Sequence, residues 1–170
     1  MPSFVGHFAI PLAARIARTI PPRLLAAGFV AAMLPDADTV GALFGVERGT
    51  LFAHRGITHS IIFAVIVALA TTVLARWLRS TPRATFAFVL ACALSHPLLD
   101  VFTNGGPGVM LGWPLSTARV FAPWRPIEVS PIGAAFFSAR GLDVVLSELT
   151  WVVAPAFLLA VAARAARRAS

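Results

Sequence analysis

The chain has 170 residues, of which 58% are hydrophobic and 12% charged, and its mean hydropathy is +0.84. These values exclude an ordinary soluble domain and predict a polytopic membrane protein. The net charge of +7 comes from 14 arginines without a lysine, and these lie beside apolar stretches, so we expect a membrane partner and no nucleic acid.

The apolar stretches predict an all-α membrane bundle of four to five transmembrane helices with one long irregular loop, forming a single domain over residues 1–170. A spanning helix needs about 20 apolar residues, which sets this number. The expected helices cover residues 4–20, 24–44, 60–78, 84–102 and 142–163, and a Gly-, Pro- and Trp-rich loop covers residues 103–141.

Prolines mark the expected irregularities of these helices. The first helix is expected to bend or break at Pro11, and Pro21-Pro22 predicts the turn that follows it. The second helix is expected to break at Pro35. Thr58 is the expected N-cap of the third helix.

Three groups of arginines lie between or after the apolar stretches, and the positive-inside rule assigns them to the cytoplasmic side of an inner membrane. This places the C-terminus in the cytoplasm. The groups are Arg15, Arg18 and Arg23; Arg76, Arg79 and Arg83; and Arg164, Arg167 and Arg168.

The histidines and most aspartates form short clusters beside the apolar segments, where ionisable side chains normally pair, bind ions or carry out chemistry. Measured along each helix, the clusters lie about 16 to 25 Å from the nearest arginine group, so we expect them to converge near the opposite surface. The residues are His7 in the first apolar stretch; Asp36 and Asp38 in LPDAD; His54 and His59 in HRGITHS; and His96 and Asp100 in SHPLLD.

The spacing within these clusters fits metal ligands. His96 and Asp100 are four residues apart and share one face of a helix. Gly56 permits a tight turn after His54, and Pro35 leaves the aspartates in a less regular segment. Mixed imidazole and carboxylate ligands favour one or two divalent ions, zinc above all, with manganese or iron as alternatives.

The segments LPDADTV, HRGITHS, SHPLLDVFTNGG and GWPLSTARVFAPWRPIEVSPIG resemble the signatures of the LexA-binding, inner-membrane-associated hydrolase family, also called YdjM-like metal-dependent hydrolases. The resemblance covers about residues 4–133 and implies a hydrolase without naming a substrate. A fainter similarity is to the all-helical zinc phospholipase C and nuclease class. The metal-site positions that the family resemblance implies are His7, Asp36, His54, His59, His96 and Asp100.

The resulting hypothesis is a metal-dependent hydrolase that cleaves a phosphoester of a lipid or lipid-linked substrate with metal-activated water. Asp38 or His59 would take up or orient the proton, and Arg55 would offset charge on the phosphoryl oxygens. Arg119, Trp124 and Arg125 in the long loop are expected to bind an anionic lipid headgroup. The expected metal ligands are His7, Asp36, His54, His96 and Asp100.

Two other classes remain open. The same buried side chains could bind an ion or proton in a membrane transporter, which predicts a site near the midplane with access from both sides. A non-catalytic membrane scaffold with a structural metal predicts a closed site with four protein ligands. Glu148, near the start of the last helix, is a further candidate acid or base.

Overall fold

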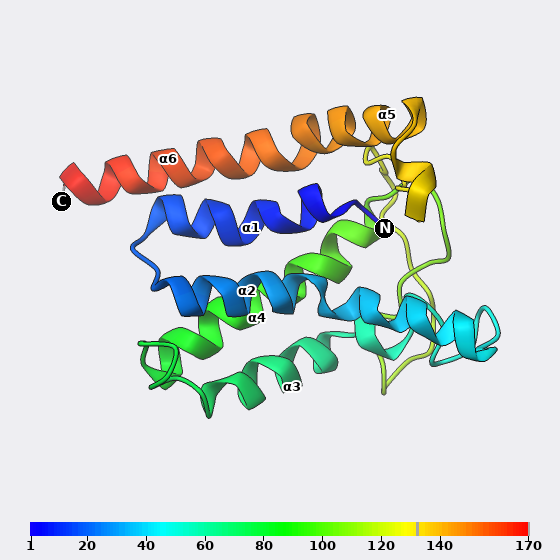
Figure 1. The fold of residues 1–170 in the computed structure, drawn as a ribbon, viewed down its shortest axis with the longest axis horizontal. Coiled ribbons are helices and arrows are strands. Elements are labelled where there is room, and N and C mark those ends of the chain that lie inside the picture. Colours follow the sequence, from blue (N-terminus) through cyan, green and yellow to red (C-terminus); the bar gives the residue numbers. More distant parts are fainter. Residues whose placement is uncertain (132, 170) are drawn as a thin grey trace.

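A computed structural model describes residues 1–131 and 133–169, which form the helical bundle drawn in Figure 1. Within this part of the chain the only β-pairing consists of isolated bridges, Thr103 with Ile127 and Val109 with Val120. The expected all-helical class is confirmed. The helices are α1 (Phe4–Ala17), α2 (Pro22–Met33), η1 (Leu34–Phe44), η2 (Ile57–His59), α3 (Ile61–Thr72), α4 (Pro82–Val101), η3 (Gly133–Phe136), α5 (Ala139–Glu148), η4 (Leu149–Val153) and α6 (Ala154–Ala169).

The prolines act in two ways. Helix α1 continues through Pro11, so the chain is not interrupted there, and Pro22 begins α2 as expected from its preference for the first helical turn. At Leu34, directly before Pro35, the α-helix changes to the 3-10 helix η1. The second apolar stretch therefore stays helical through Pro35 instead of breaking there. Its helix changes from α to the more tightly wound 3-10 form at the segment that carries the two aspartates.

The third and last helices differ from their predicted ranges. Helix α3 ends at Thr72, and the chain turns from there to Pro82. Its N-cap is Ser60, whose hydroxyl accepts from the Phe63 N–H, and Thr58 instead points toward the polar cluster. The last helix starts at Ala139, earlier than expected, and continues through the π-helical segment η4 into α6.

Three helical stretches are long and apolar enough to cross a membrane: Pro22–Phe44, Pro82–Val101 and Ala139–Ala169. Helices α1 and α3 are apolar but shorter. Large apolar side chains such as Leu69, Leu158 and Leu159 remain more than half exposed on the outer faces of the bundle. Such surfaces are stable against lipid chains and would be costly in water.

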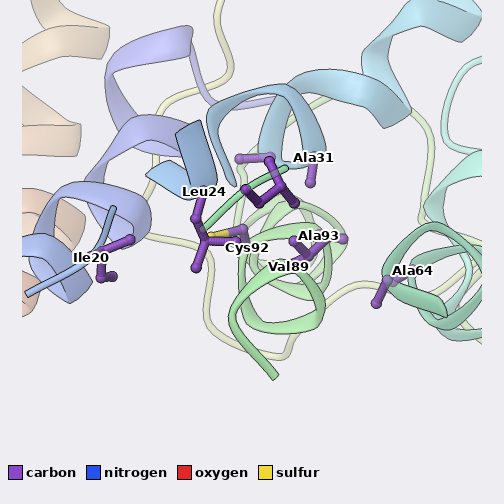
Figure 2. Close-up of a cluster of buried hydrophobic side chains, with 10 residues drawn as sticks. Ile20, Leu24, Ala31, Ala64, Val89, Cys92 and Ala93 are labelled. Atoms are coloured by element: carbon purple, nitrogen blue, oxygen red, sulfur yellow. The ribbon is translucent and has the colours of Figure 1, made fainter. Parts of the chain in front are cut away.

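Small side chains fill the contact between the helices. The core cluster in Figure 2 includes Ala31 of α2, Ala64 of α3, and Cys92 and Ala93 of α4. Gly28 approaches α4 so closely that a Cβ atom there would lie 2.5 Å from the Phe88 ring. Close approach of backbones through small residues is the usual way in which membrane helices pack.

The two ends of the bundle differ in composition (Figure 1). The α1–α2 turn, the α3–α4 turn and the C-terminal end of α6 lie together at one end, which carries the three arginine groups and is called here the arginine end. The N-terminus, η1, the long loop and α5 lie at the other end, called here the site end. The predicted polar motifs all belong to the site end.

Candidate metal centre

Three polar side chains from separate elements face one another at the site end. Asp36 comes from η1, His59 from η2 and His96 from α4, and all three are buried. The His96 Nε2 atom lies 3.1 Å from His59 Nε2 and 3.2 Å from Asp36 Oδ1, and His59 Nε2 lies 3.6 Å from the same carboxylate oxygen. Ligands of a tetrahedral ion with bonds of about 2.0 Å are separated by about 3.3 Å. The triad therefore has the spacing of three ligands of one metal ion.

Hydrogen bonds on the far side of each ring direct the Nε2 lone pairs inward. His96 Nδ1 lies 2.6 Å from the Ala32 carbonyl oxygen, so it carries the proton and donates it there. His59 Nδ1 lies 3.2 Å from Asp38 Oδ2, a carboxylate that accepts. Carbonyl and carboxylate partners of this kind fix the tautomer of metal-binding histidines. Both imidazoles are thus prepared to coordinate through Nε2.

The same cluster contains buried polar atoms without hydrogen-bond partners. They include both carboxylate oxygens of Asp36, Oδ2 of Asp100 and both ring nitrogens of His7. Buried polar groups are nearly always satisfied, because an unsatisfied one costs about 1–3 kcal/mol. An ion would satisfy the carboxylate oxygens of Asp36 and Asp100 and one ring nitrogen of His7, so the residues present fit a divalent metal.

His7 and Asp100 extend the cluster on one side of His96. The His7 ring of α1 stacks on the His96 ring with centroids 3.8 Å apart, and His7, His96 and Asp100 form a second group with metal-ligand spacing. Asp100 Oδ2 also lies 3.3 Å from His59 Nε2. The cluster thus offers ligands for one ion at the triad and for a second ion beside it.

Arg55 lies behind Asp100 and is fully buried. Its guanidinium donates to Asp100 Oδ1 at 3.1 Å, to the Thr103 hydroxyl at 2.8 Å, and to the carbonyl oxygens of Gly105 and Pro107. These bonds hold one oxygen of Asp100 and leave Oδ2 directed at the histidines. Arg55 therefore positions Asp100.

The turn that carries Arg55 depends on a glycine. A Cβ atom on Gly56 would lie 2.0 Å from the Leu51 carbonyl oxygen, so no other residue fits without movement of the backbone. Arg55 itself has φ +65°, a conformation that non-glycine residues rarely adopt. The HRGITHS motif is therefore a tight turn that brings Arg55 and His59 to the same cluster.

His54 and Asp38 form the edge of the cluster toward a cavity. His54 Nδ1 lies 2.8 Å from Asp38 Oδ1, and Asp38 Oδ2 accepts from the Thr58 hydroxyl at 2.5 Å. Both His54 and Asp38 line a cavity of about 570 Å³, together with apolar side chains such as Val46. Asp38, His54 and His59 make the third group with metal-ligand spacing. Arg48 also lines this cavity, and its side chain makes no hydrogen bond or ion pair within the described chain.

The loop residues expected to bind substrate lie outside the cluster. The Arg119 guanidinium donates to carbonyl oxygens of Thr50, His54, Arg55 and Gly108, which ties the long loop to the HRGITHS turn. Trp124 packs on Trp151 of η4, and Arg125 lies over the Phe121 ring. The structure does not bring Trp124 or Arg125 to the cavity.

Glu148 is buried at the junction of α5 and η4 and clamps the N-terminal segment. Its carboxylate accepts from the Ser3 N–H and hydroxyl and from the Gly6 N–H, directly before His7. A carboxylate with three donors is a positioning group for α1. The sequence suggested Glu148 only as a possible acid or base. The contact between Ser3 and Glu148 could not be predicted, because the two residues lie at opposite ends of the sequence.

The cluster has an excess of negative charge that calls for a cation. Burial alone would lower the pKa of His59, but the adjacent carboxylates of Asp100, Asp36 and Asp38 raise this pKa to about 10. In the ion-free protein a proton on His59 therefore neutralises part of the carboxylate charge. A divalent ion would replace that proton, since a coordinating imidazole must be neutral.

Comparison with known proteins agrees with the sequence motifs. The family model described as YdjM inner membrane protein matches residues 1–169. The chain is also similar to "Inner membrane protein YbcI" of Escherichia coli (strain K12), with 44% identity over 164 residues that cover 94% of this chain and 95% of the relative. No solved structure matches the chain significantly. The expected resemblance and the inner-membrane location are confirmed.

Proposed function

Because the chain belongs to the YdjM inner membrane protein family and has a buried cluster with metal-ligand spacing, we propose that it is a membrane-embedded metal-dependent hydrolase of a phosphoester in a lipid or lipid-linked substrate. The convergence of His59 Nε2, His96 Nε2 and Asp36 Oδ1 at 3.1–3.6 Å carries this proposal. A triad leaves the fourth tetrahedral position open, which is the pattern of catalytic rather than structural zinc sites. Bound there, a zinc-like ion would supply Lewis acidity and lower the pKa of a water molecule.

The distances favour a definite division of roles. His59, His96 and Asp36 would hold the ion, and His7 and Asp100 would serve a second ion beside it. His54, oriented by Asp38 at 2.8 Å on the cavity wall, accepts and returns the proton. The sequence-based hypothesis assigned His54 to the metal and His59 to the proton, and the geometry supports the exchange of these two roles.

The cavity beside the cluster supports an anionic substrate with an apolar part. Its walls combine apolar side chains with the unpaired Arg48, at the surface where the long loop meets η1. A guanidinium binds phosphate oxygens in a planar, bidentate manner. Arg48 therefore binds the anionic group of the substrate at the cavity wall. Arg119 binds no substrate itself but holds in place the long loop that forms the rim of the cavity.

The proposed topology has five crossing segments, with α1 and α3 included among them. The two termini lie at opposite ends of the bundle (Figure 1), as an odd number of crossings requires. The arginine end then faces the cytoplasm by the positive-inside rule. This orientation can be tested with single cysteines at Leu115 and Thr19, each introduced after replacement of Cys92. A membrane-impermeant thiol reagent added from outside should label the cysteine at position 115 and not the one at position 19. The reverse labelling pattern would mean that the topology is inverted.

The decisive experiment is elemental mass spectrometry of the detergent-purified protein. Wild type should carry zinc, manganese or iron at one or two ions per chain, and Asp36→Asn should lose it. Asp143→Asn is the matched control, because Asp143 is an exposed carboxylate outside the cluster. Absence of metal in wild type, or equal loss in the control, would contradict a metal centre.

A second measurement separates hydrolysis from the two other classes. The metal-loaded protein is incubated with phospholipids and lipid-linked phosphoesters, and released phosphate or headgroup is measured. Release that Asp36→Asn abolishes supports the hydrolase. Stable metal without release from any substrate would favour a structural metal, and metal-dependent ion flux in proteoliposomes would favour a transporter.

A further inference from the structure

A second cavity lies at the arginine end, far from the metal cluster. Its volume is about 510 Å³, and it is formed by the C-terminal turn of α1 and the last turns of α6. Helices from the two ends of the sequence thus enclose one space. The arginines that line it are Arg15, Arg18, Arg164, Arg167 and Arg168.

These arginines divide into two kinds. Arg164 and Arg167 donate to the carbonyl oxygens of Ile16 and Ala17, which are unpaired groups at the end of α1. They hold α6 against α1 and fix the shape of the cavity. Arg15, Arg18 and Arg168 make no side-chain hydrogen bond or ion pair within the described chain, so their guanidinium groups remain available.

Within residues 1–131 and 133–169, no carboxylate lines this cavity. The acidic side chains lie in η1 and the loop after it, at the end of α4, in the long loop and in α5, all at the site end. The guanidinium groups therefore repel one another, and no acidic side chain of the described residues neutralises them. An anion with several oxygen atoms would remove this repulsion and satisfy their N–H donors.

The surroundings of the cavity favour a lipid as the source of that anion. Leu12 of α1 and Leu158 and Leu159 of α6 are exposed on the helices that lead to it. A headgroup at the end of these helices would place acyl chains along their apolar faces. Basic pockets between membrane helices at such ends bind anionic headgroups.

We propose that the cavity between the C-terminal ends of α1 and α6 binds the phosphate headgroup of an anionic phospholipid as a stable, non-substrate ligand. Arg15, Arg18 and Arg168 contact the phosphate oxygens, and Arg164 and Arg167 hold the two helices in place. The bound lipid then fastens the first helix to the last. This site is independent of the proposed hydrolase activity, because it lies at the opposite end of the bundle.

The test uses the detergent-solubilised full chain, titrated with phosphatidylglycerol or with phosphatidylcholine and observed by native mass spectrometry. The altered protein is Arg15→Gln/Arg18→Gln, in which the arginines that hold the helices together are kept. The matched control is Arg76→Gln/Arg83→Gln, which removes the same charge from the α3–α4 turn at the same end. Thermal unfolding of each protein verifies folding.

Wild type should retain phosphatidylglycerol and not phosphatidylcholine. The Arg15/Arg18 variant should bind it about 30-fold more weakly, as expected for the loss of two basic contacts, and the control should change less than about threefold. Equal loss in both variants would overturn the proposal, since it would mean diffuse attraction. Displacement of the lipid by an equal concentration of inorganic phosphate would also overturn it, because the ligand would then be a soluble anion.

Discussion

The two ends of the bundle carry charge in opposite ways. At the site end, the charged and polar atoms of carboxylates, histidines and Arg55 lie within 2.8–3.8 Å of one another, and most of these side chains are buried. At the arginine end, the guanidinium groups are exposed, and no acidic side chain of the described part of the chain lies among them. Buried charges persist only when paired, whereas exposed charges need only solvent or lipid headgroups. Substitutions should therefore have large effects at the site end and small effects at the arginine end.

The largest difference is expected between the two histidines of one motif. His59→Gln removes a predicted ligand of the triad and should weaken metal binding by more than about 100-fold, whereas His54→Gln removes an outer partner and should weaken it about tenfold. Competition with a chromogenic chelator measures both. If His54→Gln proves the more damaging, the roles revert to those expected from the sequence.

Arg55→Met should lower the free energy of unfolding by about 3–5 kcal/mol, because it removes the guanidinium that pairs with the buried Asp100 carboxylate. Thermal or denaturant unfolding in detergent measures this change. Arg140→Gln is the control, since Arg140 pairs with Glu128 at an exposed position where the loss should stay below about 1 kcal/mol. Similar losses in the two proteins would refute the contrast between buried and exposed pairs.

Glu148→Gln should destabilise the protein by about 1–3 kcal/mol, because a neutral amide cannot accept from the Ser3 and Gly6 donors as the carboxylate does. Metal affinity should fall with it, since α1 carries His7. Unfolding and chelator competition are measured together, with the exposed Glu47→Gln as control. A stable variant with unchanged metal affinity would show that the clamp does not position α1.

The smallest effect is expected at the arginine end. Arg18→Gln should change the free energy of unfolding in lipid-free detergent by no more than about 0.5 kcal/mol, because the Arg18 side chain is exposed and makes no hydrogen bond or ion pair within residues 1–131 and 133–169. The same unfolding measurement detects it. A loss as large as that of Arg55→Met would mean that this end is held together by interactions of Arg18 itself.

Some of the site followed from local pattern. His96 and Asp100 are four residues apart on α4 and do share one face, and Pro35 does mark the change in helix type at the segment that carries Asp36 and Asp38. These features depend on helix periodicity and on the missing N–H of proline, which act over a few residues. The N-cap assignment was wrong because Thr58 and Ser60 are equally suitable by type. Only packing directs Thr58 toward Asp38.

Composition and helical periodicity were enough to predict an all-helical membrane protein whose ionisable residues segregate to two ends, because both are local properties. Which side chains meet depends on how the helices pack. That packing turned Arg55 toward Asp100, joined Glu148 to Ser3 across the length of the chain, and enclosed the arginine cavity between the first and last helices. Contacts between residues far apart in sequence depend on how the helices pack, and no local pattern encodes that arrangement.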